Sequence, residues 1–143
     1  MGARARPVLG RKGRPPAAAS VRAVSPRTLT GAFAAGRTLL GLALLLAPER
    51  AARGWVGDEI ERPAAQVLCR GLGARDMSLG LGTLLTLRDG GPNRRWLEAA
   101  ILADGVDVAA TLLAGKRIPR NGRLGTIALA GGSAVLGAWL SRR

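Results

Sequence analysis

The 143-residue sequence lacks histidine and tyrosine, and it contains only one cysteine and one phenylalanine. Without histidine, the chain has neither the commonest general base nor the commonest metal ligand. With so few aromatic residues, it also offers no platform on which nucleic-acid bases could stack. We therefore expect no enzyme activity, no catalytic residues, no metal site and no cofactor.

The single cysteine, Cys69, excludes an intramolecular disulfide. It lies in an apolar stretch, so we expect it to be buried as a small hydrophobic residue. Charge of one sign is abundant: the chain has 22 basic residues, 20 of them arginine, against 9 acidic residues. This excess suits the phosphates of nucleic acid and the headgroups of lipids equally well, so charge alone does not choose the partner.

Residues 1–27 hold seven basic residues, four prolines and no acidic residue. Such a composition buries too little apolar surface to offset its chain entropy, so we expect a disordered basic tail. A transit peptide is also rich in arginine, but the prolines interrupt the amphipathic pattern that it needs. We expect the tail to act as a topology signal, with an electrostatic tether to anionic lipid as the alternative.

In residues 28–143, apolar stretches alternate with short arginine-rich breaks. We predict four helical spans in this domain, at about residues 31–48, 64–87, 96–115 and 124–140. At a rise of about 1.5 Å per residue, each crosses most of a hydrocarbon layer of about 30 Å. The expected fold class is all-α, a four-helix transmembrane bundle in the cell membrane, with the lipid bilayer as its main partner.

The first apolar stretch also has the order of a cleaved signal peptide, but Pro48 follows it directly and no small-x-small cleavage site is present. We expect an anchor instead. Small residues that let membrane helices approach closely share one face in two spans: Gly71, Ser78 and Gly82 (with Arg75) in the second, and Ala130, Ala134 and Ala138 in the fourth. Trp55, Trp96 and Trp139 lie in or near the breaks, where an interfacial belt would hold them.

Charged residues inside the predicted spans are the most informative feature of the sequence. A charge at the centre of a span costs roughly 2.5 to 3.5 kcal/mol, whereas a leucine returns about 0.3 to 0.6 kcal/mol. The predicted intramembrane polar network consists of three arginines and three aspartates: Arg37, Arg70, Arg75, Asp76, Asp104 and Asp107. From the helical rise, all except Arg70 lie at one level near the middle of their spans.

We expect these charges to pair between helices, as Arg70 and Arg75 with Asp104 and Asp107, and Arg37 with Asp76. Adjacent residues on a helix point about 100° apart, so Arg75 and Asp76 are expected to face different neighbours rather than each other. Gln66 and Thr111, each one turn from a charged residue, could extend the network. The six charges sum to zero.

The network has a structural and a functional interpretation. As a structural device it fixes how the helices pack, and the leading hypothesis is a membrane protein with a structural or interaction role, with room for a homo-oligomer or a membrane protein partner. As a functional site it relays protons or binds a small cation, which makes a small transporter or proton-linked membrane protein the alternative. Asp104 and Asp107 alone make a poor metal site, because they lack further oxygen ligands.

Two hypotheses come from other classes. A soluble helical protein could bind nucleic acid through its basic tail and loops, but the long apolar stretches and the lack of aromatic residues among the basic ones speak against it. We therefore expect no nucleic-acid partner. A membrane-embedded enzyme would have only its aspartates as acid or base groups.

Basic residues near the span ends predict the orientation of the chain. A cytoplasmic N-terminus places twelve basic residues on the inner side and seven on the outer side. The basic break at residues 116–123 then lies outside, against the positive-inside rule.

Three segments carry a resemblance to a known family: GRTLLGLALLLAPERAARGWVGD from Gly36, CRGLGARDMSLGLGTLLTLR from Cys69 and LADGVDVAATLL from Leu102. Residues 30–140 resemble small integral membrane proteins of high-GC actinobacteria, grouped as a domain of unknown function. The family's Gly-Arg in the first helix, Arg-x-x-Gly-x-Arg-Asp in the second and paired Asp in the third fall on the six charges named above. The resemblance implies a four-helix membrane fold without a known activity, substrate or cofactor, and it leaves out the basic tail.

Overall fold

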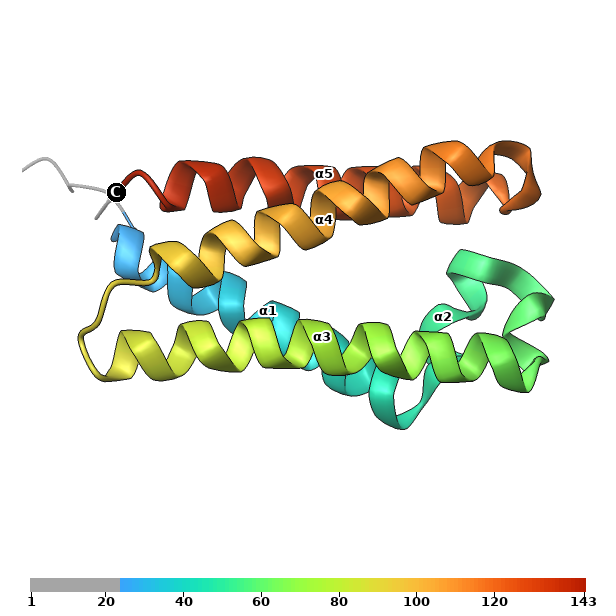
Figure 1. Cartoon of the computed structure of the whole chain (residues 1–143), viewed down its shortest axis with the longest axis horizontal. Helices are drawn as coiled ribbons and strands as arrows, with labels where there is room; N and C mark the ends of the chain where they lie inside the picture. The colour runs from blue at the N-terminus through green and yellow to red at the C-terminus, as the bar shows by residue number, and fades with distance from the viewer. Residues whose placement is uncertain (1–23) are drawn as a thin grey trace, which may run out of the picture.

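The computed structural model describes residues 24–143, which form helices and short turns with no strand among them. Four long helices lie along a common direction (Figure 1): α1 (Pro26–Leu46), α3 (Pro63–Arg88), α4 (Arg94–Ala114) and α5 (Arg120–Leu140). Shorter elements connect them at one end: α2 (Pro48–Val56) and the 3-10 helices η1 (Gly57–Glu61) and η2 (Gly115–Arg117). The prediction of an all-α fold is confirmed, with five α-helices rather than four.

The first predicted span differs from α1 at both ends. Proline starts the helix at Pro26, where its missing N–H costs no hydrogen bond, and Ser25 caps it by accepting a bond of 3.1 Å from the backbone N–H of Thr28. The predicted tail boundary at residue 27 is therefore two residues too late, and the rest of that prediction, residues 1–23, lies outside the described residues. The helix ends at Leu46 because Pro48 starts a new one.

The other three predicted spans correspond to α3, α4 and α5, whose ends lie within four residues of the predictions. The structure differs more from the prediction in the connection after the first span. We predicted a loop there, and the structure has α2 and η1. Proline at the start of α2 and Glu49 in its first turn both favour a helix there. Arg53 then holds η1 through ion pairs with Asp58 at 3.2 Å and Glu61 at 2.8 Å.

Helices α1 and α3 pack antiparallel through glycine. A Cβ on Gly41 would lie 2.5 Å from the carbonyl oxygen of Gly73, and one on Gly80 would lie 2.6 Å from that of Ala34. The two backbones therefore touch, as small residues allow between membrane helices. On the small-residue face predicted for this helix, Gly82 lies against Trp96, whereas Gly71 meets nothing within 4 Å. The face that touches α1 is a different one, which carries Gly73 and Gly80.

Helices α4 and α5 form the second pair. Leu97 and Ala100 of α4 are buried, and Gly137 of α5 lies against Ile101. The two pairs meet less extensively than the helices within each pair (Figure 1). One close contact joins them near the α3–α4 turn, where the Trp96 ring covers Gly82.

The α2–η1 segment closes one end of the molecule. Ile60 is fully buried and packs with Leu44, Ala52 and Cys69, so the expected burial of Cys69 is confirmed. On the other side, the backbone of α2 lies so close to Gly122 of α5 that no side chain would fit there.

Among residues 24–143, two helices are long and apolar enough to cross a membrane: α1 and α5. Helices α3 and α4 have sufficient length, but the charged residues within them lower their mean hydropathy. Length and composition therefore support two of the four predicted spans.

Candidate functional site

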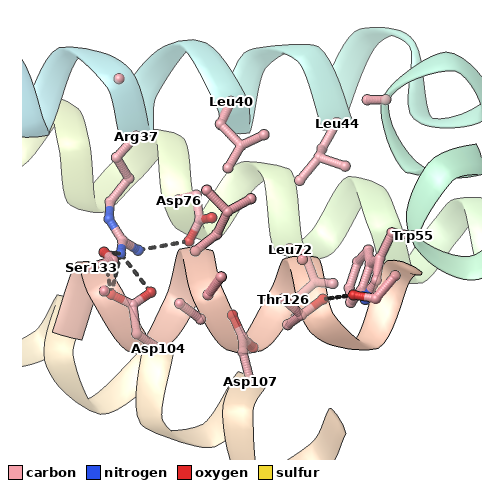
Figure 2. Close-up of a pocket in the computed structure, with 18 of the residues that line it drawn as sticks. Arg37, Leu40, Leu44, Trp55, Leu72, Asp76, Asp104, Asp107, Thr126 and Ser133 are labelled. Atoms are coloured by element: carbon pink, nitrogen blue, oxygen red, sulfur yellow. Dashed lines mark hydrogen bonds and ion pairs between the residues drawn. The ribbon is translucent and has the colours of Figure 1, made fainter. Parts of the chain in front are cut away.

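Arg37 lies near the middle of α1 and reaches across to α3 and α4. Its side chain is only 7% exposed. The guanidinium donates a hydrogen bond of 3.0 Å from Nη1 to Asp76, and Nη2 lies 2.5 Å from both carboxylate oxygens of Asp104 (Figure 2). One arginine therefore ties three of the long helices together through charge-assisted bonds.

The fourth long helix joins this cluster through Ser133. Its hydroxyl accepts a bond of 2.9 Å from Arg37 Nη2 and donates one of 2.6 Å to Asp104. Sequence reasoning missed this residue, because it searched the spans for charge. The available signal was a serine in the middle of a stretch, residues 124–140, that is otherwise almost entirely apolar.

Arg75 and Asp107 form a second, bidentate ion pair between α3 and α4, with distances of 3.0 Å and 2.6 Å. Arg75 also donates from Nε and Nη2 to Asp76 Oδ1 at 3.2 Å. The same oxygen accepts the bond from Arg37. Asp76 thus links the two arginines, and the five side chains form one continuous network.

The structure does not bring Arg70 into this network, contrary to our prediction. Its side chain is exposed, and the bond that it makes is one of 3.4 Å to Gln66. The five residue steps from Arg70 to Arg75 turn the helix by about 140° beyond a full turn, so the two side chains point to different faces. Gln66 lies outside the network as well, because it donates to Glu49 at 2.8 Å.

Two details of the predicted pairing also differ. Asp104 pairs with Arg37 rather than with an arginine of α3. Contrary to the prediction, Arg75 also contacts its neighbour Asp76, at 3.2 Å. Thr111 is buried one turn beyond Asp107 but makes no hydrogen bond to these charges among the described residues.

The exclusion of Arg70 changes the charge of the network. Two arginines and three aspartates give a formal charge of −1 rather than zero. Residues 24–143 contain no cluster of three His, Cys, Asp or Glu side chains that could hold a metal ion.

The network lines part of an open cavity of about 770 Å³ between the two helix pairs. Leucines from α1, α3 and α5 line its walls: Leu40, Leu44, Leu72, Leu129 and Leu136. Trp55 of α2 lies at the opposite end from Arg37 and Asp104 (Figure 2). The cavity therefore has a charged end, apolar walls and an aromatic end.

The indole of Trp55 carries an unpaired donor. Its Nε1 atom is buried and has no hydrogen-bond acceptor among the described residues. Nearby, the hydroxyl of Thr126 is already used, because it donates to the carbonyl oxygen of Gly122 at 3.0 Å. Sequence reasoning placed Trp55 in an interfacial loop and gave no sign that α2 would turn it toward the cavity.

Comparison of the chain with protein-family models, curated proteins and solved structures finds no match. The resemblance to actinobacterial membrane proteins therefore stays a prediction.

Proposed function

We propose that the chain is a multi-pass protein of the cell membrane in which α1, α3, α4 and α5 all cross the bilayer. Each has at least 21 residues and spans about 30 Å at 1.5 Å per residue, which matches the hydrocarbon layer. Its role is structural or one of interaction, with the Arg/Asp network as the internal connection between helices.

The observation that carries this proposal is the network of five charges at mid-helix, each within hydrogen-bond distance of an opposite charge. Helices α3 and α4 carry costly charges for a bilayer, and pairing with neighbouring helices removes most of that cost. Because Arg37 comes from α1, the first helix belongs to the folded domain, as an anchor does and a cleaved signal peptide does not.

The outer surface of the helices supports the same proposal. Large apolar side chains are widely exposed, among them Leu46 at 71%, Leu113 at 84% and Val135 at 72%. Only 11% of the apolar stretch of α5 is buried inside the molecule. A soluble protein rarely exposes so many large apolar side chains, whereas lipid covers them at no cost.

The basic residues favour one orientation. Counted with the seven basic residues of residues 1–27, the end where α1 begins has twelve basic residues, against seven at the end that holds α2, η1 and η2. We propose that the end with twelve faces the cytoplasm.

Fractionation of cells that express the full chain tests the proposal. We expect the protein to stay in the membrane pellet through washes with high salt and with alkaline carbonate, and to dissolve only in detergent. Release by salt would contradict the proposal and favour a basic protein that binds membrane surfaces or nucleic acid.

The cavity favours a second candidate, a small transporter or proton-linked protein, since carboxylates at mid-membrane that face an open space are typical of transport sites. Asp104→Asn, which leaves the shape almost unchanged, distinguishes the two. A transport activity would be lost altogether, whereas a structural role would weaken in proportion to the loss of stability.

A further inference from the structure

The cavity between the helix pairs opens to the molecular surface, and several of its lining residues are exposed. Glycines line it where larger side chains would fit: a Cβ on Gly36, Gly125 or Gly132 would meet nothing within 4 Å. Its volume of about 770 Å³ lies in the range of roughly 300 to 1,000 Å³ that small-molecule sites occupy.

The charge at its end is unbalanced. Every donor bond that Arg75 makes goes to Asp76 or Asp107, and those of Arg37 go to Asp76, Asp104 and Ser133. Both positive charges are therefore neutralised inside the cluster, and the third carboxylate leaves a charge of −1. Asp107 is the most accessible of the three, with its side chain 23% exposed, against 5% for Asp104. In apolar surroundings such a charge favours a cation beside it.

The remaining walls match an apolar body that carries that cation. Leu40, Leu72 and Leu136 flank the space, and Trp55 adds an aromatic surface, which attracts cations through its face.

We propose that this cavity binds a monovalent organic cation with apolar substituents, with the charge beside Asp107 and Asp76 and the apolar part between the leucine walls. The inference rests on the proposed membrane protein, because such a cation reaches the cavity from the lipid. It gives the second candidate function a substrate class.

Two ions of the same shape and opposite charge test the proposal. The full-length protein is placed in lipid nanodiscs, and saturable binding of tetraphenylphosphonium and of tetraphenylborate is measured by equilibrium dialysis against empty nanodiscs. We expect the cation to bind at least tenfold more tightly than the anion. Equal binding, or preference for the anion, would overturn the proposal.

Variants connect the binding to the cavity. Asp107→Asn brings the network to zero charge and is expected to weaken tetraphenylphosphonium binding at least tenfold. Asp89→Asn, an equal change at an exposed position in the α3–α4 turn, is expected to leave it unchanged. The proposal fails if the two variants bind the cation alike.

A second pair of variants keeps the network intact. Gly125→Leu fills the cavity and is expected to abolish binding, whereas Gly131→Leu, in the same helix and with equally free space, does not line the cavity and is expected to bind as the wild type does. The proposed site is contradicted if both variants lose binding or if both keep it. If the protein resists carbonate but does not bind the cation, the proposed site is wrong and the proposal of a membrane protein stands. If carbonate releases the protein, the proposal of a membrane protein is itself wrong.

Discussion

The guanidinium of Arg37 is the group on which most of the network depends. It contacts Asp76 on α3 as well as Asp104 and Ser133, which belong to α4 and α5. Without it, Asp104 would keep only a serine hydroxyl as partner, and Asp76 only its neighbour Arg75. Buried carboxylates without a counter-charge are costly in an apolar environment.

We predict that Arg37→Met lowers the free energy of unfolding by about 3 to 5 kcal/mol, the usual cost of removing one partner from a buried ion pair. Chemical denaturation in mixed detergent micelles, followed by circular dichroism, measures the change.

Arg70→Met is the matched control. Because Arg70 is exposed and pairs only with Gln66 at 3.4 Å, its replacement is expected to change stability by less than about 0.5 kcal/mol. Equal losses in the two variants would contradict the arrangement of the network.

A second residue-scale prediction concerns Arg75 and Asp107. Their bidentate contact predicts a coupling energy of about 1 to 3 kcal/mol in a double-mutant cycle of Arg75→Ala and Asp107→Ala, measured by the same denaturation. Arg75 with Asp104, which the structure does not pair, is expected to couple more weakly. The reverse order would mean that α3 and α4 pack in another register.

Five of the six predicted network residues come together, because their depth follows from sequence spacing alone. The face of the helix on which each charged residue lies was predicted less well than its depth. Arg70 lies about 8 Å from the common level, at the same rise per residue, and on another face, and both facts were accessible from the sequence. The partner of each charge was not, because it depends on which helices are neighbours.

At the scale of the helices, the contact between α1 and α3 depends on glycine. The buried residues of α1 recur at intervals of three and four (Thr30, Ala34, Arg37, Gly41 and Leu44), and those of α3 follow the same spacing. Gly41 and Gly73 lie where the two backbones touch.

We predict that Gly41→Ala destabilises the protein by about 1 to 3 kcal/mol, because its methyl group overlaps the backbone of α3. Gly36→Ala in the same helix has free space around it and is expected to stabilise slightly, by about 0.5 to 1 kcal/mol, since alanine favours helix over glycine. Thermal unfolding in detergent compares the two. Stabilisation by both substitutions would contradict the close approach.

The four long helices were predictable from their apolar stretches, and Pro63 and Pro48 mark helix starts in the sequence. Helix α2 was missed because its nine residues are mostly polar or small, and its stability comes from packing around Ile60 and against Gly122. The face of α3 that touches α1 was not predicted for a related reason: several faces of the helix carry small residues, and the partner helix selects one.

At the scale of the whole molecule, the two helix pairs meet through the charged network, and an open cavity lies between them beside it. This arrangement places charges where water is scarce and apolar side chains where lipid would lie. Soluble proteins show the opposite distribution, with apolar side chains inside and charged ones outside. Charges inside and apolar side chains outside are physically consistent when the four long helices cross a bilayer.

Side-specific labelling of two single cysteines is the measurement that tests this account most directly. In a Cys69→Ala background, Arg95→Cys and Lys116→Cys place an exposed thiol at opposite ends of α4, and a membrane-impermeant maleimide is added to intact and to permeabilised cells. We predict that Lys116→Cys reacts in intact cells and Arg95→Cys only after permeabilisation. The reverse pattern would keep the spans and invert the orientation, whereas labelling of both from the same side would contradict a helix that crosses the membrane.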